Sequence, residues 1–299
     1  MNWSKLVQYL MAATVFFTVA ACSEDDEGII LGGGGTSDPV KPSSEVASRL
    51  EIPALKSGNQ LITHWTTERG EKVMDYCLEY DYDKYHSRWV AFRFDGSTRA
   101  KNVSRKSYDI KPQYPRDPLL THNYIEDDRS FNGYNHGHLC ASADRLYSRD
   151  ANDKTFYMSN MSPMIGDFNS GYWTKFEGFV QQKGRDRAFA DTLYVVKGGT
   201  IDDGKFSRRV ASNRIVVPKY YFMAVLKVKN NVYSSIGFWM EHKDYGYSYD
   251  HQAPKSVLKE KAVSIQTLEK LTGIDFFHNL PDKVEAQVEK NFVPSAWGL

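Results

Sequence analysis

The chain has 299 residues, 41% of them hydrophobic and 14% aromatic, a composition typical of a chain that is globular through most of its length, with one large core or two modest ones. Its formal net charge is +1, but without Lys5 and the four acids at positions 24–27, residues 37–299 carry 37 basic and 33 acidic side chains, an excess of 4. This mild excess permits a polyanionic substrate, but it lacks the clear basic footprint of strong nucleic-acid binders.

Residues 1–21 have the pattern of a signal peptide. Lys5 provides a short positive region, and the apolar run that follows, residues 7–21, is too short and too early for a membrane span. The run ends in Val-Ala-Ala-Cys, which resembles a bacterial lipobox. We therefore predict that Cys22 is acylated and becomes the first residue of the mature protein; the alternative is an ordinary secretory signal in which Cys22 is incidental.

Residues 22–47 predict an acidic, glycine-rich and flexible tether. The acidic run at 23–27 resembles signals that send some lipoproteins to the outer face of the outer membrane, so we expect a surface-exposed outer-membrane lipoprotein, with periplasm-facing attachment as the alternative. Four consecutive glycines at 32–35, with Pro39 and Pro42, cannot build a core. We expect a single domain over residues 48–299.

Export would place Cys77 and Cys140 where disulfides persist. The sequence leaves two interpretations open, a Cys77–Cys140 bridge or two buried thiols. No Cys-x-x-Cys spacing is present, which excludes a zinc ribbon.

Alternating aromatic and β-branched residues predict strands at 62–65, 74–82 and 89–94. A basic run with interleaved aromatic residues follows. It could form a phosphate-contacting edge, but the pattern by itself favours an ordinary solvated loop. The run contains Arg99, Lys101, Arg105, Lys106, Tyr108, Lys111, Tyr114 and Arg116.

Residues 134–145 place two histidines, His136 and His138, on either side of one glycine. Histidine changes charge near neutral pH and is the commonest general base. We take His138 as the candidate base.

Residues 155–163 predict a strand running into a turn, and Asp167 is the predicted N-cap of a helix that starts near Phe168. On that helix Asn169, Trp173 and Glu177 recur every four residues and share one face. An Asn carbonyl on Mg²⁺, with Glu177 holding its water shell, suits a cation that keeps several waters. The spacing alone favours the alternative, an amphipathic helix with a solvated Glu.

The remaining segments predict structural elements. Strands are expected at 192–198, 215–228 and 233–240, with Pro218 at a strand edge or turn. Residues 263–271 predict a helix with Ser264 as N-cap and Gly273 after its end. Glu241, at a strand end, could approach the site. The other histidines are interpreted as surface or packing residues because their spacing follows no ligand pattern: His242, His251 and His278.

Three ordered segments carry a family resemblance. They are Asn-His-Gly-His-Leu-Cys-Ala-Ser-Ala-Asp-Arg (135–145), Phe-Tyr-Met-Ser-Asn-Met-Ser-Pro (156–163) and Phe-Asn-Ser-Gly-Tyr-Trp-Thr-Lys-Phe-Glu (168–177). Their order and spacing resemble the DNA/RNA non-specific endonuclease family, which includes endonuclease G. The resemblance implies an α+β fold with a ββα-metal (His-Me finger) core on a central, mainly antiparallel β-sheet flanked by helices.

The resemblance also implies the site and the reaction. His138 would be the general base, Asn169 the direct ligand of Mg²⁺ (or Mn²⁺), and Glu177 would orient metal-bound water, with Asn160 at the site. Arg105 is the best candidate for the phosphate contact, with Arg93 and Arg116 as alternatives. The implied activity is metal-dependent hydrolysis of DNA and RNA. Further expected substrate-binding residues are Asn135, His136, Arg145 and Arg116.

The chain departs from the family where Asn135 and His136 replace an Asp-Arg pair and Cys140-Ala141 replaces Ala-Pro. His136 is a weaker, pH-dependent substitute for the fixed arginine fork. We expect activity to be retained, with a changed pH dependence or substrate preference. The alternative from another class is a catalytically weakened surface lipoprotein that binds nucleic acid or another polyanion.

Overall fold

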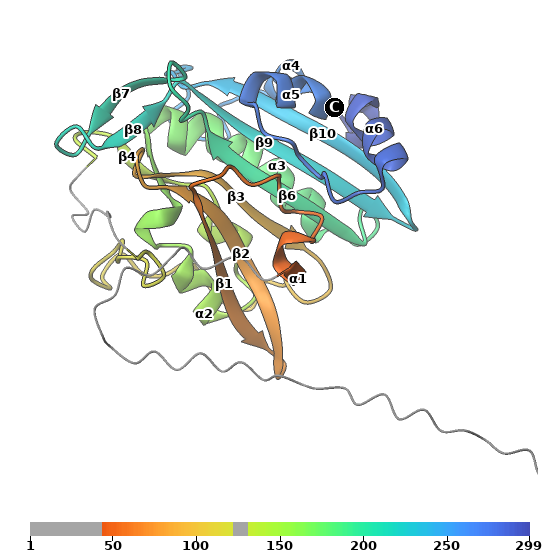
Figure 1. Ribbon diagram of the computed structural model, residues 1–299, viewed down its shortest axis with the longest axis horizontal. Helices are drawn as coiled ribbons and strands as arrows, with labels where there is room; N and C mark the ends of the chain where they lie inside the picture. The colour runs from red at the N-terminus through yellow and green to blue at the C-terminus, as the bar shows by residue number, and fades with distance from the viewer. Residues whose placement is uncertain (1–43, 122–130) are drawn as a thin grey trace, which may run out of the picture. The chain divides into compact units, whose positions relative to one another are not determined.

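A seven-stranded antiparallel sheet dominates the computed structural model, which describes residues 44–121 and 131–299 within one compact unit, Pro39–Leu299. The strand order is β1-β2-β3-β6-β9-β10-β11 (Figure 1). The strands are β1 (Gln60–Glu68), β2 (Glu71–Asp81), β3 (His86–Phe94), β6 (Thr192–Gly199), β9 (Tyr220–Lys229), β10 (Val232–Glu241) and β11 (Ala262–Val263).

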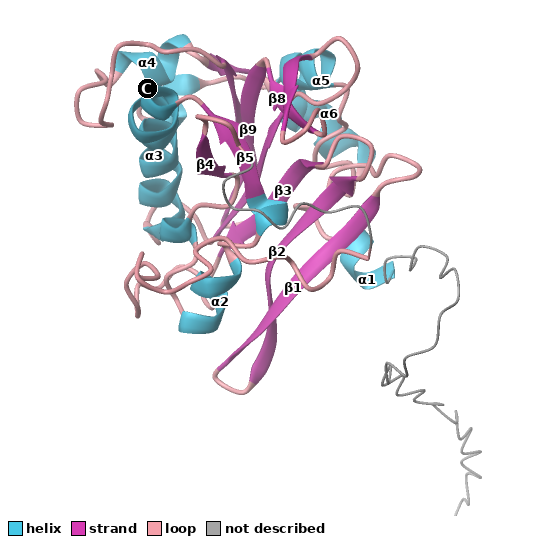
Figure 2. Ribbon diagram, turned by 90° about the vertical axis from the view of Figure 1, so that its left-hand side faces the viewer, coloured by secondary structure: helices cyan, strands magenta, loops and turns pink. Residues whose placement is uncertain are grey.

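Helices cover both faces of this sheet (Figure 2). Strand residues alternate between the faces, so Val90 and Phe92 of β3 pack in one core while Trp89 and Ala91 pack in the other. The first core contains residues of α3 (Thr174–Arg185) and α4 (Ser256–Glu260); the second contains residues of α1 (Ser44–Ala47), α5 (Ile265–Thr272) and α6 (Asp282–Lys290). Strands buried on both faces explain the dense β-branched runs of the sequence.

A small ββα unit lies on the α3 face. Strand β4 (Asn135–His138) pairs with β5 (Met161–Met164), and the chain then enters α3 through a π-helical turn, η3 (Phe168–Trp173). Around this unit lie η1 (Ser142–Asp144), α2 (Arg149–Lys154), η2 (Met158–Asn160), the hairpin β7 (Phe206–Val210) and β8 (Ile215–Pro218), and the C-terminal turn η4 (Pro294–Trp297).

Most of the predicted elements are confirmed, and α5 has both expected caps. Ser264 accepts a hydrogen bond from the Thr267 N–H, and Gly273 ends the helix at φ 73°. Residues 215–228 form two strands, because the chain passes from one sheet to another after Pro218.

One local prediction is wrong. Residues 155–163 do not begin as a strand: they turn through η2 before β5, where the Met158 N–H bonds to the Pro115 carbonyl. The helix does begin at Phe168 with Asp167 in the N-cap position, but the Asp167 side chain makes no capping hydrogen bond and accepts from the Ser248 hydroxyl instead.

The two cysteines are free, buried thiols, so the disulfide alternative is wrong. Cys77 packs in the core beneath α5 and α6, whereas Cys140 packs in the core beneath α3. The sheet separates them.

The signal peptide, Cys22 and most of the tether lie outside the described residues. Within residues 44–121 and 131–299, no helix has the length and apolar character needed to cross a membrane.

Candidate active site

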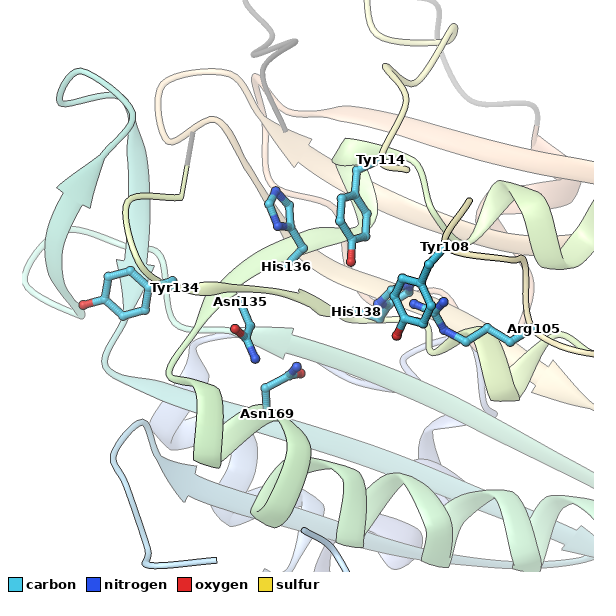
Figure 3. A pocket seen from close by; sticks show the side chains of 8 residues that line it. All are labelled: Arg105, Tyr108, Tyr114, Tyr134, Asn135, His136, His138 and Asn169. Atoms are coloured by element: carbon cyan, nitrogen blue, oxygen red, sulfur yellow. The ribbon is translucent and has the colours of Figure 1, made fainter. Parts of the chain in front are cut away.

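Five of the predicted site residues line one cavity of about 290 Å³ beside the ββα unit (Figure 3). They come from three segments: the basic run, strand β4 and the turn η3. The lining residues are Arg105, Tyr108, Tyr114, Tyr134, Asn135, His136, His138 and Asn169. Among the described residues, the lining contains one arginine and no carboxylate, a composition that suits a phosphate.

Strand β4 holds His138 between the sheet and the helix. The His138 carbonyl accepts a hydrogen bond from the Trp173 indole at 3.2 Å, and its ring meets Phe156 edge-on at 4.9 Å between centroids. A side chain on Gly137 would place its Cβ 2.2 Å from the Met164 sulfur. A larger residue at 137 would therefore have to displace the buried Met164 side chain, which accounts for a glycine between the two histidines.

The environment of His138 keeps its imidazole uncharged. Burial, followed by the positive neighbours Arg105 and His136, lowers the pKa of His138 to about 3. Its Nε2 atom is buried and has no hydrogen-bond partner within the described parts of the chain. An unpartnered, neutral ring nitrogen in a polar cavity is available to accept a proton.

His136 lies in an aromatic stack. Its ring is 4.2 Å from that of Tyr114 and 4.3 Å from that of Phe131, with interplanar angles of 6° and 12°. Stacking of this kind contributes about 0.5–1.5 kcal/mol per pair. His136, at the position where the resembled family has arginine, thus stabilises the cavity wall by stacking.

Asn169 reaches the cavity from the wide turn η3, and its side chain and that of Asn135 point toward one another (Figure 3). Insertions of a π turn into a helix occur frequently at functional sites. Amide oxygens are ligands for hard divalent cations, and Mg²⁺ needs few of them because it keeps several waters. The two amides, with the orphaned His138 Nε2 nearby, fit a cation site completed by water and phosphate.

The basic run is an irregular and mostly exposed loop, as its pattern favoured, but part of it also borders the cavity. The Arg105 guanidinium stacks on Tyr108 at 4.0 Å and on Phe156 at 4.7 Å from the ring centroids. Asp117 anchors the end of the loop, since its carboxylate lies 2.9 Å from the His64 Nε2 and accepts from the Ser159 hydroxyl. The loop therefore presents Arg105 to the cavity in a defined position.

Glu177 is not part of the cavity lining. Its carboxylate accepts from the Lys197 ammonium at 3.2 Å, and the same ammonium donates to Asp144 at 2.7 Å. Burial, opposed by Lys197 and assisted by Asp144, raises the pKa of Glu177 to about 7. The carboxylate helps hold α3 against the sheet and the 142–144 turn.

Two predictions of direct roles are corrected. Arg145 is fully buried and donates to the backbone carbonyls of Asp144, Asp75 and Arg93, so it cannot contact substrate. Asn160 is also fully buried, and its amide bonds to both backbone groups of Cys140. It supports the segment after His138 without reaching the cavity.

The alternative arginines do not line the cavity either. Arg93 pairs with Asp95 at 2.7 Å, and Arg116 donates to the Leu120 carbonyl. Glu241 is exposed beside Lys243, 2.7 Å away, and also lies outside the lining.

The structure gives a supporting role to two further residues, one of which, His242, packs against Phe168 and Tyr221 in agreement with its interpretation as a surface or packing residue. His242 accepts from the Ile165 N–H at 2.8 Å, and the Ile165 carbonyl in turn accepts from the Asn169 N–H, so His242 braces the start of the helix that carries Asn169. The sequence gave no sign of this role for His242, which appears there as a lone histidine. Lys197 could have been recognised, because a lysine within an apolar β run must have buried partners.

Comparison with known proteins gives a family match and several similar nucleases. A sequence model of the DNA/RNA non-specific endonuclease family matches residues 57–283. The mitochondrial nuclease EXOG of Homo sapiens is 29% identical over 220 residues, which are 69% of this chain and 56% of that protein. Nuclease C1 of Cunninghamella echinulata var. echinulata is 30% identical over 162 residues, 51% of this chain and 60% of that protein. The chain thus spans less than two thirds of either relative.

A solved chain from the crystal structure of the EndoG/EndoGI complex resembles this fold with a TM-score of 0.57. It is 23% identical, and the match covers 74% of this chain and 89% of that chain. At this identity the likeness shows the fold alone. The predicted α+β fold with a ββα-metal core is confirmed.

Proposed function

Because the chain belongs to the DNA/RNA non-specific endonuclease family, we propose that it is a metal-dependent nuclease that hydrolyses phosphodiester bonds in both DNA and RNA. The observation that carries the proposal is the shared cavity of His138, Arg105 and Asn169. This hydrolysis requires a neutral base, a positive side chain that binds the phosphate, and an oxygen ligand for a metal ion. His138, Arg105 and Asn169 provide these groups in that order.

Each residue has a distinct part. His138, neutral and unpartnered at Nε2 among the described residues, takes a proton from the attacking water. Arg105 holds the phosphate, and its stacking on two aromatic rings limits the freedom it loses on binding. Asn169, with Asn135 opposite, would hold Mg²⁺ or alternatively Mn²⁺. The chemistry that the cation supplies when bound is neutralisation of the charge that builds on the phosphate and the leaving oxygen.

Glu177 and Asn160 are positioning residues in this proposal. Glu177 ties α3 to Lys197 of β6, and Asn160 fixes the backbone of Cys140, two residues after the base. Losing either would displace the catalytic groups without removing them.

The test is digestion of supercoiled plasmid and of RNA across a Mg²⁺ titration, with and without chelator. We expect His138→Ala to lose about 10²–10⁴-fold in rate, the usual cost of removing a general base, and Asn169→Ala to need more Mg²⁺. His251→Ala is the matched control, because that side chain is 75% exposed and lies outside the cavity lining.

The assay also separates the competing function. Tight nucleic-acid binding by the wild type, without cleavage at any Mg²⁺ concentration, would favour the weakened binding lipoprotein. Cleavage by His138→Ala at the wild-type rate would exclude His138 as the base.

We propose further that a lipid on Cys22 anchors the protein to the outer membrane, on its surface or facing the periplasm. The lipobox-like Val-Ala-Ala-Cys at 19–22 supports this. Wild-type protein should fractionate with membranes and Cys22→Ser should not; equal fractionation of the two would contradict the anchor.

A further inference from the structure

A second cavity, of about 430 Å³, lies at the hairpin β7–β8. Asn132 contributes to its wall, and Tyr134, two residues later, contributes to the wall of the catalytic cavity. One short segment therefore borders both cavities. The remaining lining comes from the hairpin: Arg208, Arg209, Val210, Ala211, Ser212 and Asn213.

Arg208 connects the hairpin with the catalytic cavity. Its guanidinium donates twice to the Tyr134 hydroxyl, at 2.9 and 2.6 Å, and lies 5.1 Å from the centroid of the tyrosine ring. Tyr134 stands at the edge of the catalytic cavity, beside the hairpin (Figure 3). A ligand that leaves the catalytic cavity past Tyr134 meets Arg208 next.

An apolar cluster fixes the position of the hairpin. Val210 and Val217, one from each strand, pack with Phe131 and Met161, and Met161 pairs directly with His138. These side chains are nearly or fully buried. The two arginines are thus held at a constant distance from the catalytic segment.

The charges of the two arginines are not neutralised by the hydrogen bonds that the described residues give them. Arg208 donates to a phenol oxygen, and Arg209 donates to the backbone carbonyls of Asp83 and Arg214. By contrast, the buried Lys197 is paired with two carboxylates. Arg209 also lies near the Asp203 carboxylate, but that carboxylate is paired with the Lys84 ammonium. An arginine whose hydrogen-bond acceptors are neutral retains its attraction for phosphate, which its planar fork matches bidentately.

Polar groups complete the surface. The hairpin turns through three successive residues at positive φ, Ala211, Ser212 and Asn213, at 52°, 55° and 64°. Left-handed backbone in non-glycine residues is costly and persists where the surrounding structure requires it. The turn brings a hydroxyl and an amide to the cavity, and such groups commonly contact phosphate and sugar.

We propose that the β7–β8 hairpin is a second nucleic-acid contact, in which Arg208 and Arg209 bind backbone phosphates of the strand outside the catalytic cavity. The inference rests on the proposed nuclease function and extends it. The hairpin raises affinity for polymeric substrates irrespective of sequence, because phosphate contacts position a strand without reading its bases.

The test measures binding of a fluorescent single-stranded DNA oligonucleotide, in chelator, at several salt concentrations. Arg208→Ala and Arg209→Ala should each weaken binding by about three- to tenfold, and each should reduce the salt slope by about 1. Arg69→Ala is the matched control: its side chain is 82% exposed, on the β1–β2 turn at the opposite end of the molecule (Figure 1).

Tyr134→Phe distinguishes a phosphate contact from mere support of the cavity wall. This variant removes the acceptor of Arg208 and leaves the ring. If Tyr134→Phe reproduces the full affinity loss and salt slope of Arg208→Ala, Arg208 acts only through Tyr134 and the proposal is overturned. A smaller effect of Tyr134→Phe supports it.

Turnover of bis(p-nitrophenyl) phosphate separates this proposal from the nuclease function, because that small diester needs the catalytic cavity alone. The arginine variants should lose more activity on the polymer than on the small diester. If the wild type cleaves neither substrate, the proposed nuclease function is contradicted, and the binding data still test the proposed role of the hairpin. If the wild type cleaves both substrates and the arginine variants bind DNA as tightly as the wild type with the same salt slope, only the proposed role of the hairpin is contradicted.

Discussion

Replacing Lys197 with Met tests the buried charge cluster behind the active site. The lysine ammonium lies 2.7 Å from an Asp144 carboxylate oxygen and 3.2 Å from a Glu177 carboxylate oxygen, and the Lys197 and Asp144 side chains are fully buried. Methionine keeps most of the apolar stem but removes the charge. Two carboxylates are then left without their shared cation.

The expected loss is large because of that burial. Breaking a buried ion pair by removing one partner costs about 3–5 kcal/mol, since the remaining charge stays uncompensated. For a domain of this size, where 1 kcal/mol shifts the unfolding temperature by about 2–4 °C, this corresponds to a drop of at least about 6 °C. Asp144 keeps its bonds from the Ala141 N–H and the Gln181 amide, which favours the lower part of the range.

The loss should shrink at acidic pH. The pKa of Glu177 is raised from 4.5 to about 7 in the folded protein, so between these values the folded state binds more protons than the unfolded state and stability falls as pH rises. Without Lys197 the carboxyl pKa rises further. At pH 5 the carboxyl group is neutral and needs its cation less than at pH 7.5.

Urea unfolding at pH 5 and pH 7.5 measures both effects. Lys229→Met is the matched control, because that lysine pairs with Asp191 at 2.7 Å on the surface, where both side chains are at least 32% exposed; exposed pairs contribute about 0–1 kcal/mol. If Lys197→Met costs no more than the control, or costs more at pH 5 than at pH 7.5, the reasoning about the cluster is refuted.

Two further predictions concern the catalytic strand. Gly137→Ala should lower the unfolding free energy by about 1–3 kcal/mol, as overpacking does, because its Cβ would lie 2.2 Å from the Met164 sulfur. Gly178→Ala is the control, and it should be neutral or stabilising because nothing lies within 4 Å of the added Cβ. Equal effects of the two substitutions on the unfolding free energy would contradict the packing argument. The pKa of His138 is lowered to about 3, so the base stays neutral well below pH 6.5. We therefore expect kcat/KM on the small diester to show no acid limb from this residue near neutrality. A limb near pH 7 that persists in both Glu177→Gln and His136→Phe would contradict the assignment.

The regular parts of the fold were predictable because they depend on local patterns. The period-two alternation of β2 and β3 reflects the two faces of the sheet, and the caps of α5 at Ser264 and Gly273 are local hydrogen-bonding and φ requirements. The short strand β4 was missed, since its four residues, with a glycine among them, carry no strand pattern. It exists because it pairs with β5.

Within the site, the sequence indicated the candidate residues better than it indicated their surroundings. His138 was singled out by its His-Gly-His context and Asn169 by the family resemblance, and the two share the cavity. In the sequence, Arg145 and Glu177 were both candidate site residues. In the structure both are buried: Arg145 donates hydrogen bonds to backbone carbonyls, and the Glu177 carboxylate accepts from the Lys197 ammonium. Burial and ion pairing depend on the folded structure, so the sequence alone could not distinguish residues that line the cavity from residues that are buried beside it.

The stretch at 134–145, with its partners at 156–163 and 168–177, was enough to indicate the family, and through that resemblance the ββα-metal core and the candidate base. Tertiary structure decided what lies around that base. Packing of the Met164 side chain against β4 favours glycine at 137, folding of the basic run brought Arg105 to the cavity, and the hairpin placed Arg208 against Tyr134. These contacts join segments up to 74 residues apart, and only the folded chain brings such segments within the few ångströms over which hydrogen bonds and packing act.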